Sequence, residues 1–168
     1  MSEPGLSVPL ADAQATEALG ASLADAMPPP DRGSFVVHLH GDLGAGKTTL
    51  VRGLLRRLGV CGIVRSPTYT LVEPYQAGAV TAVHVDLYRL RDPQDMEDLG
   101  LRDYLAPDTV LMIEWPEQGG TLTPPADLDI EIDYAGEARR ARLRPSSARG
   151  VELMNLWKNI APMDKSLI

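Results

Sequence analysis

Residues 41 to 48 read Gly41-Asp42-Leu43-Gly44-Ala45-Gly46-Lys47-Thr48, which matches the phosphate-binding pattern G-x-x-x-x-G-K-[ST] at every fixed position. Residues 35–40 before it form a β-branched, largely apolar run, and residues 49–58 after it have the spacing of an amphipathic helix that ends at Gly59. A strand, a glycine-rich loop and a helix in this order are the context that the pattern requires. With glycine at about 7% of residues, the pattern alone arises by chance in roughly one chain in a hundred of this length. We therefore interpret the segment as a nucleotide-binding loop.

The residue types in this loop predict how it holds phosphate. Gly41, Gly44 and Gly46 let the backbone curl until its N–H groups point inward at a polyphosphate, where a Cβ atom would collide. The helix that starts near Lys47 directs the positive end of its dipole at the same place. We expect Lys47 to reach the β and γ phosphates and the Thr48 hydroxyl to ligate the Mg²⁺ that bridges them.

Length and composition limit the class of protein. The chain of 168 residues fits a single domain, which we place at residues 1–160, followed by a tail at 161–168 that we expect to be disordered. It has no run of 18 apolar residues and no basic N-terminus followed by an apolar segment, so we predict a cytoplasmic protein without a membrane anchor. The only cysteine, Cys61, excludes an internal disulfide and is expected to be buried or half-buried. A net charge of −7 argues against direct binding of nucleic acid, so any contact with tRNA would be indirect.

The apolar periodicity predicts an α/β fold. We expect a P-loop NTPase-like single domain whose central sheet is mostly parallel, flanked by helices and extended by antiparallel strands and hairpins. Strands are predicted at 6–10, 35–40 and 109–113, hairpins at 66–75 with 79–87 and at 127–134 with 138–144, and helices at 13–27, 49–58 and 151–160. Two short helical stretches are predicted between residues 93 and 105.

Two carboxylates come directly after apolar strands. Asp86 follows residues 83–85, and Glu114 follows residues 110–113. In P-loop proteins an acidic residue at a strand end beside the loop holds Mg²⁺ directly or through water, and either residue qualifies by position. The alternative for each is an ordinary polar residue at the edge of a strand.

Other polar residues have a functional and a structural interpretation. Thr68 and Thr70 are hydroxyls that can fold over the γ phosphate as a switch, or simply β-branched residues of an extended segment. His38 and His40 alternate on one strand and share a face, where we favour structural roles. His84 shares a face with Asp86, but Mg²⁺ prefers oxygen, so support of a ligand or core packing is favoured over direct binding.

Four segments of the chain together resemble the TsaE (YjeE) family over about residues 6 to 158. They are Gly41-Asp42-Leu43-Gly44-Ala45-Gly46-Lys47-Thr48-Thr49, Ser66-Pro67-Thr68-Tyr69-Thr70-Leu71-Val72-Glu73-Pro74-Tyr75, His84-Val85-Asp86-Leu87-Tyr88-Arg89-Leu90 and Ile113-Glu114-Trp115-Pro116-Glu117. The resemblance implies Mg²⁺-dependent hydrolysis of ATP to ADP and phosphate. It also implies association with the TsaD and TsaB homologues that place the threonylcarbamoyl group on adenosine 37 of tRNA.

The same resemblance assigns roles by position. Catalytic roles fall to Lys47, Asp86 and Glu114, with Thr48 and Glu114 holding Mg²⁺ and Asp86 supporting one of its ligands or reaching it through water. ATP contacts fall to residues 41–49, to Arg139, and on the base side to Ala13 and Thr16. Ser66, Thr68, Thr70 and Trp115 fall in the switch region that borders the site.

Alternative functions use the same loop. A GTPase is disfavoured because neither Asn155 nor Asn159 begins an Asn-Lys-x-Asp element. A P-loop kinase acting on a small molecule stays open, since residues 139–144 are rich in arginine as a phosphate-closing lid would be. An adaptor that binds ATP but barely hydrolyses it is the non-catalytic alternative.

Overall fold

The strand and the helix predicted around the glycine-rich loop are both present. In the computed structural model, which describes residues 5–29 and 32–161, β2 covers Phe35–His40 and α2 covers Lys47–Leu58. The other strands are β1 (Leu6–Leu10), β3 (Val72–Ala77), β4 (Val80–Asp86), β5 (Thr109–Glu114), β6 (Leu128–Ala135) and β7 (Ala138–Pro145). The other helices are α1 (Ala13–Asp25) and α3 (Ala148–Ile160), with the 3₁₀ segments η2 (Pro93–Met96), η3 (Leu101–Tyr104) and η4 (Pro116–Leu122).

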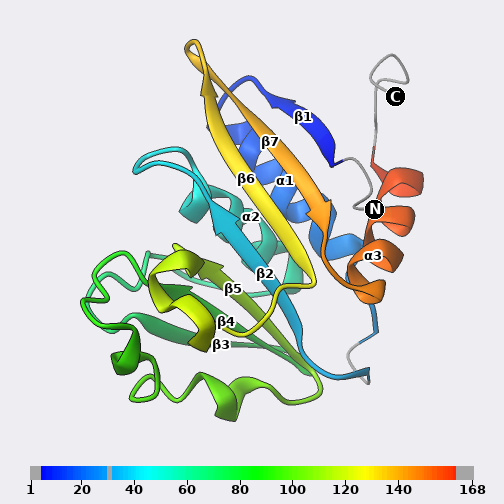
Figure 1. Cartoon of the computed structure of the whole chain (residues 1–168). Coiled ribbons are helices and arrows are strands. Elements are labelled where there is room, and N and C mark those ends of the chain that lie inside the picture. The colour runs from blue at the N-terminus through cyan, green and yellow to red at the C-terminus, as the bar shows by residue number, and fades with distance from the viewer. Residues whose placement is uncertain (1–4, 30–31, 162–168) are drawn as a thin grey trace.

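The seven strands form one sheet in the order β1-β7-β6-β2-β5-β4-β3 (Figure 1). The four inner strands β6, β2, β5 and β4 run parallel, whereas β1, β7 and β3 pair antiparallel with their neighbours. All six residues of β5 are buried, as a parallel strand covered on both faces requires. The predicted α/β domain with a parallel centre and antiparallel additions is confirmed.

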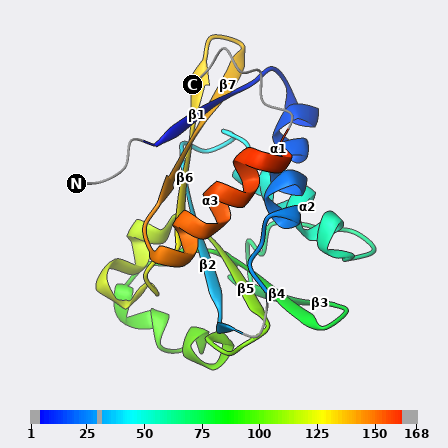
Figure 2. The same cartoon turned by 90° about the vertical axis from the view of Figure 1, so that its right-hand side faces the viewer.

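The helices α1, α2 and α3 cover one face of the sheet, and the 3₁₀ segments lie on the other (Figure 2). Two glycines let α1 and α2 cross closely. A Cβ at Gly20 would lie 2.1 Å from the Leu50 carbonyl oxygen, and one at Gly53 would lie 2.0 Å from the Glu17 carbonyl oxygen. Since no larger residue fits at either position, the sequence holds α1 against the helix that follows the glycine-rich loop.

Helix ends follow their capping residues. The side chain of Asp12 accepts a hydrogen bond from the Ala15 backbone N–H at 2.8 Å and starts α1 where the sequence predicts. Ser147 caps α3 in the same way, so this helix begins at Ala148, three residues before the predicted start. The Ser147 hydroxyl caps the helix at a position that the apolar spacing alone does not indicate.

The first predicted hairpin is shorter than expected. Residues 66–71 form a turn, in which the Leu71 backbone N–H donates to the Pro67 carbonyl at 2.9 Å, and the strand begins only at Val72. Leu71 has a positive φ of 62°, which ends the turn and interrupts extended pairing. The expectation for Cys61 is also wrong, because its side chain is exposed.

Two further expectations concern the termini and membranes. The tail prediction for residues 161–168 falls outside the described residues except for Ala161. Among the helices that the structure describes, none combines the length and the apolar character needed to cross a bilayer.

Candidate functional site

The glycine-rich loop lies between the end of β2 and the start of α2. Gly41, Gly44 and Gly46 have φ angles of 138°, 78° and 114°, in the region that favours glycine. A Cβ at Gly41 would lie 2.4 Å from the carbonyl oxygen of Ile132 in β6. Gly46 is the N-cap of α2, so the helix offers its first N–H groups at the loop. A loop of this shape, at the positive end of a helix, is suited to a polyphosphate.

The side chain of Lys47 folds back into the glycine-rich loop. Its side chain is buried, and its Nζ donates to the carbonyl oxygens of Gly41 at 2.6 Å and Asp42 at 2.9 Å. The ammonium also lies 4.2 Å from the centre of the Trp115 ring. Burial lowers the pKa of Lys47, and the attraction of Glu114 and Asp86 offsets only part of this effect. An anionic ligand at the loop would stabilise the charged form that burial disfavours.

The two predicted carboxylates are neighbours across parallel strands. Asp86 at the end of β4 is the register partner of Glu114 at the end of β5. Glu114 Oε1 accepts a hydrogen bond from the Thr48 hydroxyl at 2.8 Å, and His84 Nε2 lies 2.7 Å from the same oxygen. Asp86 accepts from the Ser66 hydroxyl. Hydroxyl and carboxylate groups from four segments of the chain therefore meet at one end of the sheet.

These groups face a cavity of about 420 Å³. Its lining includes the predicted residues Leu43, Gly44, Gly46, Lys47, Thr48, Thr49, Ser66, Thr68, Asp86, Glu114 and Trp115. Thr48, Asp86 and Glu114 offer oxygen atoms, which are the donors that Mg²⁺ prefers, so this set fits the ion that the sequence implies. Thr70 is exposed and is not part of the lining.

A second cavity of about 160 Å³ lies on the other side of the loop. Ala13 and Thr16 of α1 line it together with Arg139 of β7, and Gly44, Gly46 and Thr49 line both cavities. Ala13 and Thr16, which we assigned to the base side, are thus brought together beside the loop with Arg139, which we assigned to ATP contact.

Several residues of the site are missing from the sequence prediction. The Tyr134 hydroxyl donates to the Leu43 carbonyl at 3.1 Å, and the Arg139 guanidinium stacks 3.9 Å from the centre of the Tyr134 ring. Tyr88 and Arg89 line the first cavity. Both residues follow Asp86 within three positions, and this closeness in sequence could have identified them as part of the site. No local sequence pattern links Tyr134 to the loop.

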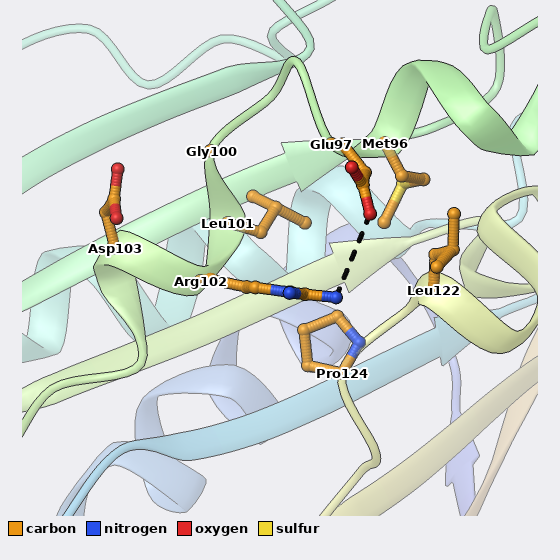
Figure 3. A pocket seen from close by; sticks show the side chains of 8 residues that line it. All are labelled: Met96, Glu97, Gly100, Leu101, Arg102, Asp103, Leu122 and Pro124. Atoms are coloured by element: carbon orange, nitrogen blue, oxygen red, sulfur yellow. Dashed lines mark ion pairs between the residues drawn. The ribbon is translucent and has the colours of Figure 1, made fainter.

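A separate hollow of about 220 Å³ lies among η2, η3 and the end of η4 (Figure 3). Its Arg102 and Glu97 side chains approach to 3.9 Å but are both largely exposed. Such an exposed pair contributes little, and the hollow is lined by residues outside the predicted set.

The parallel centre of the sheet, the glycine-rich loop and the strand-end carboxylates define a P-loop NTPase-like α/β domain. The model of the family "Threonylcarbamoyl adenosine biosynthesis protein TsaE" matches residues 10–142. The chain belongs to the TsaE family, whose members take part in tRNA threonylcarbamoyladenosine biosynthesis.

Individual relatives agree with this assignment. The chain is 45% identical to the "tRNA threonylcarbamoyladenosine biosynthesis protein TsaE" of Haemophilus influenzae over 126 residues, which is 75% of this chain and 80% of that protein. It is 38% identical to the protein of the same name from Nostoc sp., over 81% of this chain and 83% of that one. The crystal structure of Bacillus subtilis YdiB superposes with a TM-score of 0.77 at 28% identity and covers 95% of this chain and 97% of that one.

Proposed function

We propose that the protein hydrolyses ATP to ADP and phosphate in a Mg²⁺-dependent reaction. We further propose that it supports the threonylcarbamoyladenosine modification of tRNA through association with TsaD and TsaB homologues. One observation carries the enzymatic part: Lys47 and Thr48 share a single cavity with the carboxylates of Asp86 and Glu114. Membership of the TsaE family supports the biological part.

The residues of the cavity divide the chemistry among them. The amides of the loop and the Lys47 ammonium neutralise the charge that develops on the phosphates during transfer. When bound, Mg²⁺ supplies charge neutralisation between the β and γ phosphates, and Thr48 and Glu114 would hold it. The Asp86 carboxylate, which accepts from the Ser66 hydroxyl and the Tyr88 backbone N–H, would orient the attacking water.

The charge of the chain points to action through other proteins. A net charge of −7 opposes direct contact with the tRNA backbone, so ATP turnover would affect the modification through partners that hold the tRNA. Such coupling requires that the ATP and ADP forms differ in affinity for the partner. Thr68 lines the cavity from the turn at residues 66–71, so this turn is the segment that we expect to respond to the γ phosphate.

The test measures phosphate release from labelled ATP, with and without the TsaD–TsaB pair. We expect slow release alone, faster release with the pair, and tighter association with the pair in ATP than in ADP. Lys47→Ala should abolish release, whereas Lys158→Ala, a lysine substitution in α3, should not. In a parallel incubation with cell metabolites, label that moves to a small-molecule acceptor would identify a kinase instead. ATP binding without release of phosphate under single-turnover conditions, both with and without the partners, would identify an adaptor.

A further inference from the structure

Two histidines and an aspartate meet on the face of the sheet that α1 and α2 leave open. Side chains alternate between the two faces of a strand. Val37 and Leu39 of β2 are buried in the core on the helix side, so His38 and His40 point to the other face. Asp129 of the neighbouring strand β6 is the register partner of His38. The three side chains belong to neither of the cavities beside the loop.

The distances among these side chains suit a small metal ion. One ligand atom from each residue lies within 4.8 Å of those of the other two. Asp129 Oδ1 lies 3.0 Å from His40 Nε2 and 3.6 Å from His38 Nδ1. In a tetrahedral zinc site with bonds of about 2.0 Å, neighbouring ligand atoms lie roughly 3.3 Å apart. The two separations from Asp129 Oδ1 are therefore close to those of a tetrahedral site.

The outer nitrogen of each ring lies near an oxygen atom. His38 Nε2 lies 2.8 Å from the Pro124 carbonyl oxygen, which only accepts hydrogen bonds, so this nitrogen carries the proton. In the neutral ring, Nδ1 is then a lone pair that faces the Asp129 carboxylate, and either a proton or a metal ion between them would join these two acceptors. His40 Nδ1 lies 3.5 Å from Glu117 Oε2. Histidines that bind metals commonly donate their second N–H to a carbonyl or carboxylate, and Pro124 is such an acceptor for His38.

The surroundings leave room for a further ligand. A hollow of about 290 Å³ opens at His40 and Asp129 and is also lined by Glu131, Arg142 and Arg144. Two imidazoles and one carboxylate suit zinc and similar divalent transition metals, whereas Mg²⁺ avoids nitrogen. Three protein ligands with an open fourth position are typical of zinc sites that hold water or an exchangeable ligand.

We propose that His38, His40 and Asp129 form a binding site for a divalent transition metal of the zinc type, separate from the nucleotide cavity. The ion would link β2 to β6 and, through Pro124 and Glu117, to the segment around η4. Because His40 directly precedes Gly41, the ion would also fix the strand end from which the loop starts.

The test uses the untagged, metal-stripped full chain and Zn²⁺ as the probe. The background variant Cys61→Ser removes the exposed thiol as a competing ligand. The hydrogen bond to Asp129 outweighs burial and raises the pKa of His40, so protons compete for this ring and the titration is done at about pH 8. We expect one Zn²⁺ per chain by calorimetry and a melting temperature that rises with Zn²⁺ but not with equal Mg²⁺. Co²⁺ in its place should give the visible absorption of a tetrahedral complex.

Substitutions separate this site from adventitious binding. His38→Ala and His40→Ala should abolish binding, and Glu117→Gln should weaken it by about 10- to 100-fold. Glu152→Gln, which changes a carboxylate of α3 that pairs with Arg32 outside the site, should leave binding unchanged. Asp129→Asn keeps the size of the side chain, so loss of the Zn²⁺ response in a variant that still folds cooperatively supports the site. Failure to bind Zn²⁺ stoichiometrically, or equal binding by Asp129→Asn, overturns the proposal. Neither outcome bears on ATP hydrolysis.

Discussion

His84 Nε2 lies 2.7 Å from Glu114 Oε1, the oxygen that also accepts the hydrogen bond of Thr48. His84 is fully buried, and its Nδ1 has no hydrogen-bond partner in the part of the chain that the structure describes. A carboxylate oxygen only accepts, so Nε2 carries the proton and donates. One buried imidazole thus fixes the side chain that we expect to hold Mg²⁺.

Loss of this hydrogen bond should raise the Mg²⁺ concentration needed for turnover. His84→Leu removes the donor, and we expect the half-saturating Mg²⁺ concentration for phosphate release to rise about tenfold, the lower end of the range for supporting residues of metal ligands. His84→Gln places an amide N–H close to the position of Nε2 and should recover much of the difference. Equal Mg²⁺ dependence in both variants would reduce His84 to a packing residue.

Lys47 provides the most direct test of the loop. A ligand that binds only the native state stabilises it by RT ln(1 + [L]/Kd), which is about 2.7 kcal/mol at a hundredfold excess over Kd. We expect MgATP and MgADP to raise the melting temperature of the wild type and of Lys158→Ala, and to have little effect on Lys47→Ala. A full shift in Lys47→Ala would show that the nucleotide binds elsewhere.

Asp86 and Glu114 should differ in the quantity that their loss changes. Glu114→Gln removes a proposed Mg²⁺ ligand and should raise the Mg²⁺ requirement for ATP binding. Asp86→Asn removes the proposed water-orienting group and should lower kcat with little change in nucleotide affinity. Parallel Mg²⁺ titrations of binding and turnover separate the two effects. The reverse pattern would exchange the two assignments while leaving the fold unchanged.

The meeting of Asp86 and Glu114 could be predicted because it follows from local rules. Apolar runs identify the strands that they end, and the carboxyl ends of parallel strands lie at one edge of the sheet. The partner of His84 could not be predicted in this way. His84 lies opposite Met112 and reaches Glu114 diagonally across the two strands, and no property of either strand alone determines that contact.

The elements that the sequence missed are those held by tertiary contacts. η4 lacks an apolar period of its own, and it follows Trp115, whose positive φ of 56° turns the chain sharply after β5. The left-handed backbone conformation is unfavourable for a residue as bulky as tryptophan. The Trp115 ring contacts Lys47 and Tyr88 in this conformation. Tyr134 joins the site only because β6 and β7 extend past the loop, which no local pattern indicates.

Trp115 should report nucleotide binding through its contact with Lys47. The ammonium lies 4.2 Å from the ring centre, and phosphates that attract it would change the surroundings of the indole. The second tryptophan, Trp157, is buried in α3 and donates to Ser22, away from the site. We therefore expect the emission of Trp157→Phe to change on addition of MgATP. Unchanged emission, with binding verified by calorimetry, would mean that Lys47 keeps its place when nucleotide binds.

Arg139 should contribute to binding of the nucleoside part of ATP and not to binding of its phosphates. Its guanidinium stacks on Tyr134 and lines the second cavity with Ala13 and Thr16, on the opposite side of the loop from Asp86 and Glu114. Arg139→Ala should weaken ATP binding about 5- to 10-fold, which is roughly 1 kcal/mol.

A matched set of variants and ligands tests this assignment. Affinity for inorganic triphosphate should stay unchanged in Arg139→Ala, because that ligand lacks the base and the ribose. Arg140→Ala, at the next and exposed position of β7, should leave the binding of both ligands unchanged. Tyr134→Phe keeps the aromatic ring under the guanidinium and should retain most of the ATP affinity. Equal losses for ATP and triphosphate in Arg139→Ala would move Arg139 to the phosphate side of the site.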